Sequence, residues 1–310
     1  MRKLRLFLSL AVLALVTCCF CAAAAGATIK VWQSRAVLKA PKTESDGSTL
    51  TRGTKKPPRQ KPPAPETEEP APAPAPSTGS VLFREEFAYP DGLITNEYST
   101  WNPDHADATL SSTWEMTSGS LLALGGTGWT GIPDGCSTSS ALSAPCTASD
   151  VFRLNTKRRD FGNVTVALDL RNNYLTSSSR TPAQNWDGVH VWLHYQSQYN
   201  LYYASFNRRD GRIVIKKKCE GGSENGGTYY ELSSEVTGYP IPFGTWQHLA
   251  VSIQDNPGGS VTITMFRGGT QLLSATDTGL GCAPITAAGG VGVRGDNADF
   301  NLDNFVVTAN

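Results

Sequence analysis

The stretch GVHVWLHYQSQYNLYYASFNRRDGRIVIKKK (188–218) decides the fold, because it contains three short β-type runs separated by polar segments. Its second and third runs are joined by NRRDGR (207–212), which has the composition of a hairpin turn. No convincing helical periodicity interrupts the pattern across 80–310. Five further runs of the same kind are VTVALDL (164–170), WQHLAVSIQ (246–254), SVTITMF (260–266), GGVGVR (289–294) and FNLDNFVV (300–307). We therefore predict an all-β domain, an antiparallel sandwich of the jelly-roll kind.

Alternation within the three runs predicts which side chains share a face of the sheet. Successive side chains of a strand point to opposite faces, so one set enters the core and the other faces solvent. The inward set is Val189, Val191, Leu193, Tyr202, Ala204, Phe206, Ile213 and Ile215. The outward set is His190, Trp192, His194, Tyr203, Ser205, Asn207, Val214, Lys216 and Lys218.

If these strands and 164–170 are neighbours in one curved sheet, the outward side chains form one patch, with Arg171 near its edge. Aromatic rings beside fixed hydrogen-bonding groups suit sugar rings. Six of the 15 basic residues of 81–310 lie between Arg208 and Lys218, so the patch should be locally positive and favour an anionic polysaccharide. The alternative is that this is only the polar face that every amphipathic sheet has, with Trp192 or a histidine covered by a loop.

The N-terminal 79 residues predict export and a spacer. Residues 1–27 combine a basic start, an apolar run and a small-residue cleavage region, which is typical of a signal peptide; the alternative is an uncleaved membrane anchor. Residues 28–79 are rich in proline and poor in large apolar residues, so we expect a disordered linker. The domain is then secreted, or associated with the cell surface, and the basic half of the linker could contact a cell wall.

Four cysteines remain after removal of the signal peptide: Cys136, Cys146, Cys219 and Cys282. An even number in an oxidising compartment predicts two disulfides. Cys136 and Cys146 bracket a short loop and Cys219 with Cys282 would join distant segments, while other pairings stay open. None of these four cysteines belongs to a C-x-x-C pair, the spacing that would indicate a metal site instead.

The net charge of zero conceals an acidic domain, because 81–310 holds 15 Lys and Arg against 22 Asp and Glu. A nucleic-acid partner usually requires a broad basic surface, so we expect none. We also expect a monomer and no catalytic cofactor.

WQHLAVSIQDNPGGSVTITMFRGGTQLLSA (246–275) together with GGVGVRGDNADFNLDNFVV (289–307) resembles the concanavalin A-like lectin and glucanase superfamily, including laminin-G-like domains. LFREEF (82–87) matches its usual opening strand. The resemblance implies the fold more than the function. It also implies a structural calcium where the first and last strands meet, with Glu86 and Asp303 as ligands and Glu85 and Asp299 as additions.

Three functions are open within that superfamily. The hydrolases need two carboxylates on one strand, an E-x-D-x-x-E pattern that is missing here, so a polysaccharide lyase is favoured over a glycoside hydrolase. Gly188-Val189-His190 partly matches the Q-(I/V)-H strand of the jelly-roll lyases, and 201–205 matches their Y-x-K-x-G-x-Y strand loosely. The other two functions are a non-catalytic carbohydrate-binding module or adhesin, and a laminin-G-like protein-binding domain.

The lyase resemblance implies a role for each residue of the patch. His190 would be the base or neutraliser and Tyr203 the acid or base. Arg171, Asn207 and Lys216 would neutralise the carboxylate of the sugar. The whole site would then be a groove on the concave sheet.

Overall fold

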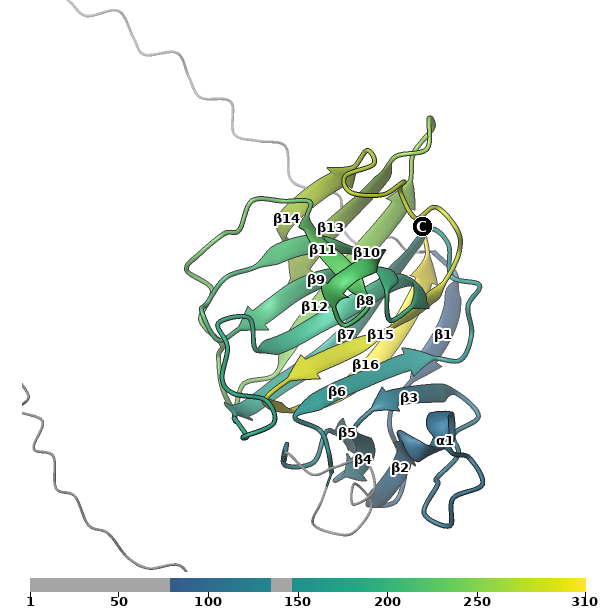
Figure 1. Ribbon diagram of the computed structural model, residues 1–310, viewed down its shortest axis with the longest axis vertical. Coiled ribbons are helices and arrows are strands. Elements are labelled where there is room, and N and C mark those ends of the chain that lie inside the picture. Colours follow the sequence, from purple (N-terminus) through teal and green to yellow (C-terminus); the bar gives the residue numbers. More distant parts are fainter. Residues whose placement is uncertain (1–78, 135–146) are drawn as a thin grey trace, which may run out of the picture. The chain divides into compact units, whose positions relative to one another are not determined.

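The computed structural model describes residues 79–134 and 147–310, which form a sandwich of two antiparallel sheets (Figure 1). The predicted fold class is confirmed. The expected signal peptide, nearly all of the expected linker, and Cys136 and Cys146 lie outside the described residues. Within the described ranges, no helix has the length and apolar character needed to cross a lipid bilayer.

The seven-stranded sheet carries the three runs that decided the fold. Its order across the sheet is β11 (Gly227–Glu231), β10 (Val214–Glu224), β9 (Asn200–Arg208), β8 (Gly188–Ser197), β15 (Gly290–Asp296), β6 (Val151–Thr156) and β3 (Trp114–Ser118). The hairpin β10–β11 curls in front of the sheet in Figure 1.

The nine-stranded sheet lies behind it. Its order is β14 (Thr270–Asp277), β13 (Val261–Arg267), β12 (Gln247–Asp255), β7 (Val164–Leu175), β16 (Ala298–Ala309), β5 (Thr127–Trp129), β4 (Ser120–Leu124) and β2 (Gly92–Asn96), with β1 (Val81–Glu85) paired to β16. One short helix, α1 (Tyr98–Trp101), follows β2.

The core lies between the two sheets, where the inward set predicted from alternation is buried. Val191 of β8 and Tyr202 of β9 meet Val166 of β7 in one hydrophobic cluster. Apolar burial of this kind is the main stabilising contribution to a sandwich of this size.

Two further links hold the sheets and their loops. Cys219, in β10, is bonded to Cys282, in the loop before β15, with Cα atoms 6.1 Å apart, so the proposed pairing of these two cysteines is confirmed. Lys217 of β10 and Asp277 of β14 form an ion pair of 2.7 Å between the sheets, and neither side chain is exposed.

Candidate functional site

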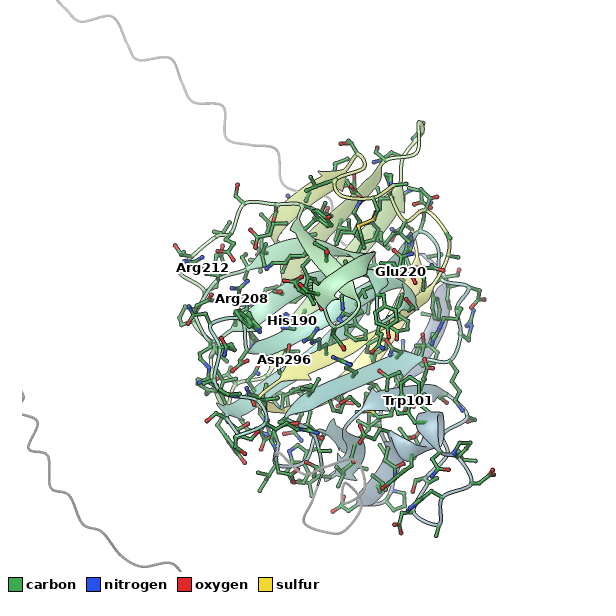
Figure 2. All side chains as sticks on the ribbon, viewed as in Figure 1. Trp101, His190, Arg208, Arg212, Glu220 and Asp296 are labelled. Carbon is green, nitrogen blue, oxygen red and sulfur yellow. A yellow bond between two sulfur atoms is a disulfide. The ribbon has the colours of Figure 1, made fainter. Side chains whose placement is uncertain are left out.

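A cavity of about 550 Å³ lies over the outer face of the seven-stranded sheet, the face turned away from the core. Strands β9, β8, β15 and β6 supply its floor, the hairpin β10–β11 its wall, and Trp186, just before β8, its rim. Figure 2 shows His190, Arg208 and Asp296 close together on this face. The lining residues are Arg153, Trp186, His190, Tyr203, Ser205, Arg208, Lys216, Lys218, Glu224, Asn225, Tyr229, Glu231, Glu235, Arg294 and Asp296.

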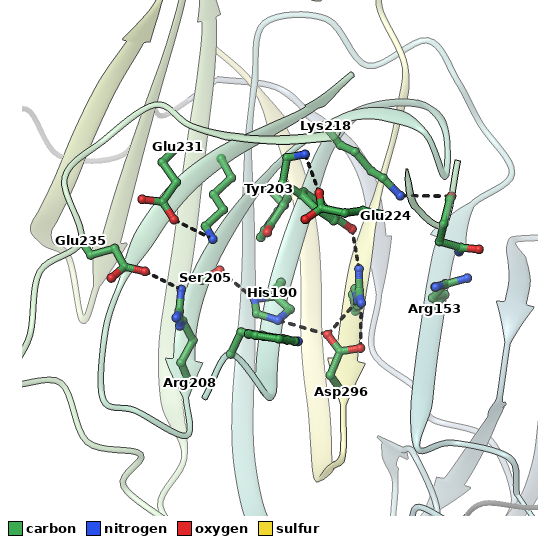
Figure 3. A pocket seen from close by; sticks show the side chains of 15 residues that line it. Arg153, His190, Tyr203, Ser205, Arg208, Lys218, Glu224, Glu231, Glu235 and Asp296 are labelled. Atoms are coloured by element: carbon green, nitrogen blue, oxygen red, sulfur yellow. Dashed lines mark hydrogen bonds and ion pairs between the residues drawn. The ribbon is translucent and has the colours of Figure 1, made fainter. Parts of the chain in front are cut away.

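His190 lies at the centre of the floor and both of its ring nitrogens have partners. Nδ1 is 2.8 Å from the Ser205 hydroxyl, and Nε2 is 3.4 Å from a carboxylate oxygen of Asp296 (Figure 3). Burial lowers the pKa of His190, although Asp296 opposes the shift. The ring is therefore neutral at neutral pH, and we assign its proton to Nε2, which faces the Asp296 carboxylate, and its lone pair to Nδ1, which faces the Ser205 hydroxyl.

Tyr203 stands beside His190 on the next strand. Its ring makes edge contacts with the rings of His190 and Tyr229, with centroids 5.4 Å away in both cases. Burial raises the pKa of Tyr203 well above its ordinary value, so the phenol keeps its proton. No hydrogen-bond partner of the hydroxyl occurs among the described residues, which leaves this donor available to a molecule in the cavity.

Three cations, Arg153, Lys218 and Arg294, gather at one end of the cavity; we call them the cation cluster. Arg294 is neutralised by Asp296, since its Nη2 donates to Oδ1 at 2.9 Å, and it also donates to the Tyr229 hydroxyl at 2.8 Å. Within the described residues Arg153 and Lys218 have no carboxylate partner: Arg153 donates to the Gln198 amide oxygen at 3.2 Å, and the Lys218 ammonium lies 4.9 Å from the centre of the Tyr229 ring.

The members of the cation cluster repel one another. Burial lowers the pKa of Arg153, and the charge of Arg294 lowers it further. Burial also lowers the pKa of Lys218. The charges of Arg294 and Arg153 lower it further, whereas Tyr229 raises it. A bound anion would relieve this repulsion and the loss of hydration.

The other cations of the cavity are already paired. Arg208 lies 2.7 Å from Asp210 and 3.2 Å from Glu235, and Lys216 lies 2.9 Å from Glu231. The uncompensated positive charge of the cavity is thus confined to the end occupied by Arg153 and Lys218.

Five residues of the predicted patch line the cavity: His190, Tyr203, Ser205, Lys216 and Lys218. Arg171 does not, and its predicted position was wrong. Its strand, β7, belongs to the nine-stranded sheet, where Arg171 stacks 5.0 Å from the Trp246 ring and donates to Asn301 at 3.0 Å. The sequence places 164–170 close to 188–195 along the chain, but the chain crosses to the other sheet between them.

His194 and Asn207 were also predicted on the wrong face, because irregularities interrupt the alternation of their strands. His194 has a left-handed φ of 42°, and its ring bonds to the Ile285 carbonyl at 2.7 Å and the Gly162 carbonyl at 3.0 Å inside the molecule. Asn207 follows a register shift between β8 and β9, and its amide donates to Asn172 of the opposite sheet at 2.6 Å. Arg208 occupies the outward position instead.

Trp192 keeps its predicted face but does not line the cavity. It is 2% exposed and stacks on Tyr195 with ring centroids 5.2 Å apart. The alternative considered from the sequence was cover by a loop, whereas the ring that stacks on Trp192 belongs to its own strand, β8.

The sequence did not predict four residues that line the cavity: Arg153, Arg294, Asp296 and Tyr229. GGVGVR (289–294) was predicted as a strand, and its alternation alone would have placed Arg294 opposite Val291 and Val293, on the outer face. Arg153 belongs to β6, which no sequence signal identified. Its place beside Arg294 follows from a long-range pairing of β15 with β6.

The proposed calcium ligands lie on the nine-stranded sheet and on the segment after β1. Glu86 pairs with Arg84 at 3.5 Å, whereas Glu85 accepts hydrogen bonds from Phe87 and Tyr89. Burial raises the pKa of Asp303, and the charges of Asp169 and Glu86 add to it. Across 79–134 and 147–310, no three His, Cys, Asp or Glu side chains are arranged to hold a metal ion. Calcium at Glu86 and Asp303 stays a prediction.

No protein-family model matches the chain, and no curated protein sequence matches it either. Among solved structures, a carbohydrate-binding module, CBM66 from Bacillus subtilis, is 12% identical with a TM-score of 0.43 and covers 63% of this chain and 95% of its own. A Bacillus subtilis protein with a galectin-like fold is 11% identical with a TM-score of 0.46, covering 75% and 97%. The alginate lyase Aly36B is 10% identical with a TM-score of 0.41, covering 73% and 95%.

Proposed function

We propose that the cavity binds an acidic saccharide, whose carboxylate lies against Arg153 and Lys218. The observation that carries this proposal is a pair of cations, the buried Lys218 and the partly buried Arg153, without a carboxylate partner among the described residues. A buried charge is normally paired, so a site that leaves two cations unpaired is suited to an anionic ligand.

The rest of the cavity supports a sugar rather than a small inorganic anion. Its volume of about 550 Å³ falls within the usual range of ligand pockets. Trp186 is 52% exposed at the rim, so its ring face is open to stacking. Tyr203 offers a hydroxyl donor, and the paired Arg208 and Lys216 offer further donors for sugar hydroxyls.

Calorimetric titration with uronic-acid oligosaccharides and with their carboxyl-reduced counterparts tests this proposal. We expect the acidic oligosaccharide to bind and its neutral counterpart to bind at least about tenfold more weakly, since one charge-assisted contact contributes about 1.5–3 kcal/mol. Arg153→Gln and Lys218→Gln should each weaken the acidic ligand by a similar factor. Arg158→Gln is the matched control, because Arg158 is exposed and paired with Asp160. Equal affinities for the two oligosaccharides would overturn the proposal.

A second candidate is cleavage of the same saccharide by β-elimination, favoured by the contact between His190 and Tyr203. The cation cluster would neutralise the carboxylate and acidify the neighbouring C–H, His190 would take that proton, and Tyr203 would protonate the leaving glycosidic oxygen. For Nδ1 of His190 to act as this base, the Ser205 hydroxyl must first rotate away from it.

Ultraviolet absorbance of the unsaturated product tests the elimination across alginate, glucuronan and pectate. His190→Ala and Tyr203→Phe should abolish the signal while saccharide binding persists. Binding without any product across the panel would leave the domain as a carbohydrate-binding module. Absence of binding as well would favour a protein partner.

We also propose that the domain works outside the cytoplasm. The signal-like residues 1–27 and the Cys219–Cys282 disulfide support an oxidising compartment.

A further inference from the structure

We propose that Ser205 is a nucleophile that removes O-acyl groups from an acidic saccharide, with His190 as its base and Asp296 orienting the imidazole. The substrate class rests on the proposed function, whereas the nucleophile rests on the geometry of three residues.

These three residues lie on adjacent strands of one sheet. Ser205 is on β9, His190 is its direct neighbour on β8, and Asp296 is on β15. Figure 3 shows the two contacts in sequence, Ser205 to Nδ1 at 2.8 Å and Nε2 to Asp296 at 3.4 Å. A nucleophile, a base within hydrogen-bond reach and a third group that orients the base are the general signature of acyl transfer.

The electrostatics fix the direction in which the proton moves. Arg294 and His190 hold the pKa of Asp296 below its ordinary value against the effect of burial, so the carboxylate is ionised and Nε2 keeps its proton. The single lone pair of the neutral ring is then on Nδ1, and it points at the Ser205 hydroxyl. The structure thus commits the basic nitrogen of His190 to Ser205.

The surroundings of Ser205 suit an ester of an acidic sugar. Ser205 lies on the floor of the cavity, and the cation cluster at its end would hold the carboxylate of the sugar. Tyr203 precedes Ser205 by two residues and so shares its face of the strand. Its protonated hydroxyl, unpartnered among the described residues, is the donor we assign to the developing oxyanion.

The reaction balances with water as the second substrate. Ser205 Oγ forms a bond to the acyl carbon while His190 Nδ1 takes the hydroxyl proton. The bond from the acyl carbon to the sugar oxygen then breaks, and that oxygen receives the proton from His190. Water, deprotonated by His190, attacks the acyl-serine, which releases the carboxylic acid and restores the Ser205 hydroxyl.

Labelling of the wild-type chain by a fluorophosphonate, followed by peptide mapping, tests the nucleophile without any variant. We expect one adduct, on Ser205, that forms more than about 100-fold more slowly in His190→Gln. Ser274→Ala is the matched control, because Ser274 is an exposed serine on the opposite sheet whose loss should leave labelling unchanged. An unmodified Ser205 in the wild-type chain would overturn the proposal.

Acetate release from an O-acetylated uronic-acid oligosaccharide tests the substrate class. We expect release by the wild-type chain, its loss in Ser205→Ala, and unchanged binding of the deacetylated oligosaccharide by that variant. Absence of acetate release would overturn the proposed ester substrate. If the deacetylated ligand still binds while Ser205 is unlabelled, this inference fails and the binding function stands. If acetate is released but Arg153→Gln and Lys218→Gln bind the acid normally, the proposed binding function fails.

Discussion

The surroundings of Lys218 lower the pKa of its ammonium group. Burial lowers its pKa, and the neighbouring charges of Arg294 and Arg153 lower it further. A bound carboxylate stabilises the protonated form, so affinity for an acidic saccharide should fall as pH rises through this lowered pKa, below the ordinary value of 10.5. Calorimetric titration from neutral to alkaline pH should show a loss of at least about tenfold, since one charge-assisted contact contributes about 1.5–3 kcal/mol.

Lys218→Arg is the control for this alkaline loss, because a guanidinium remains charged across the range. The variant should bind with nearly constant affinity up to the same pH. If wild type and variant lose affinity in parallel, Lys218 is not the titrating group.

His190 predicts a second effect, on stability. Its pKa is lower in the folded chain than the ordinary 6.5, so the unfolded chain binds more protons as pH falls below about 6.5. The contribution of His190 to stability is therefore complete above that value and declines toward acid. Urea unfolding at pH 7 and pH 5 should show a larger drop in the free energy of unfolding for wild type than for His190→Gln. An equal drop in both would show that the folded chain does not disfavour the charged ring.

The start of β8 depends on a glycine. Gly188 has a φ of 145°, and a Cβ added there would lie 1.7 Å from the Asn207 carbonyl oxygen. This close approach accompanies the register shift that turns Asn207 inward and Arg208 toward the cavity. Gly188→Ala should therefore cost at least about 3 kcal/mol of stability, the combined effect of an unfavourable φ and a backbone clash.

Gly92→Ala separates the two effects, because Gly92 has a similar φ of 141° and nothing within 4 Å of an added Cβ. Chemical unfolding should show that Gly92→Ala destabilises the chain by about 1–2 kcal/mol, from backbone strain alone. Similar losses at both glycines would mean that the backbone of β9 moves aside and that the approach to Asn207 is not a constraint.

Where β8, β9 and β10 are regular, the face on which each side chain lies could be predicted from the sequence. Period-two alternation placed His190, Tyr203, Ser205 and Lys218 on the cavity face, because their strands are regular there and one face is firmly buried. It failed at His194 and Asn207, where a left-handed residue and a register shift each moved a side chain to the other face. Such irregularities depend on the partner strand and leave no mark in local alternation.

The sheet to which each strand belongs could not be predicted from the sequence either. Arg171 was grouped with the cavity because its strand lies nearby in sequence, yet strands that follow each other in a sandwich can belong to different sheets. The pairing of β15 with both β8 and β6 brings Arg294 and Arg153 to the site from residues far apart in the chain. The charge of the cavity is thus a product of topology, and no local motif encodes it.

The Lys217–Asp277 pair joins the sheet that carries the cavity to the sheet behind it. Lys217 Nζ also donates to the Cys282 carbonyl, and Asp277 accepts from the Tyr202 hydroxyl at 2.6 Å. Burial alone would raise the pKa of Asp277, but hydrogen bonds from Lys217 and Tyr202 lower it overall. The stabilisation from this carboxylate is therefore present above its ordinary pKa and is lost as pH falls through the lowered value.

Breaking this pair on one side should be far more harmful than replacing both partners. Asp277→Asn keeps an acceptor for Tyr202 but leaves Lys217 buried without a counter-charge, so we expect chemical unfolding to show a loss of about 3–5 kcal/mol. Adding Lys217→Met removes the stranded charge and fills the same space, so the double variant should recover most of that loss. A single Asp277→Asn variant as stable as wild type would mean that the Lys217 ammonium needs no counter-charge at this position.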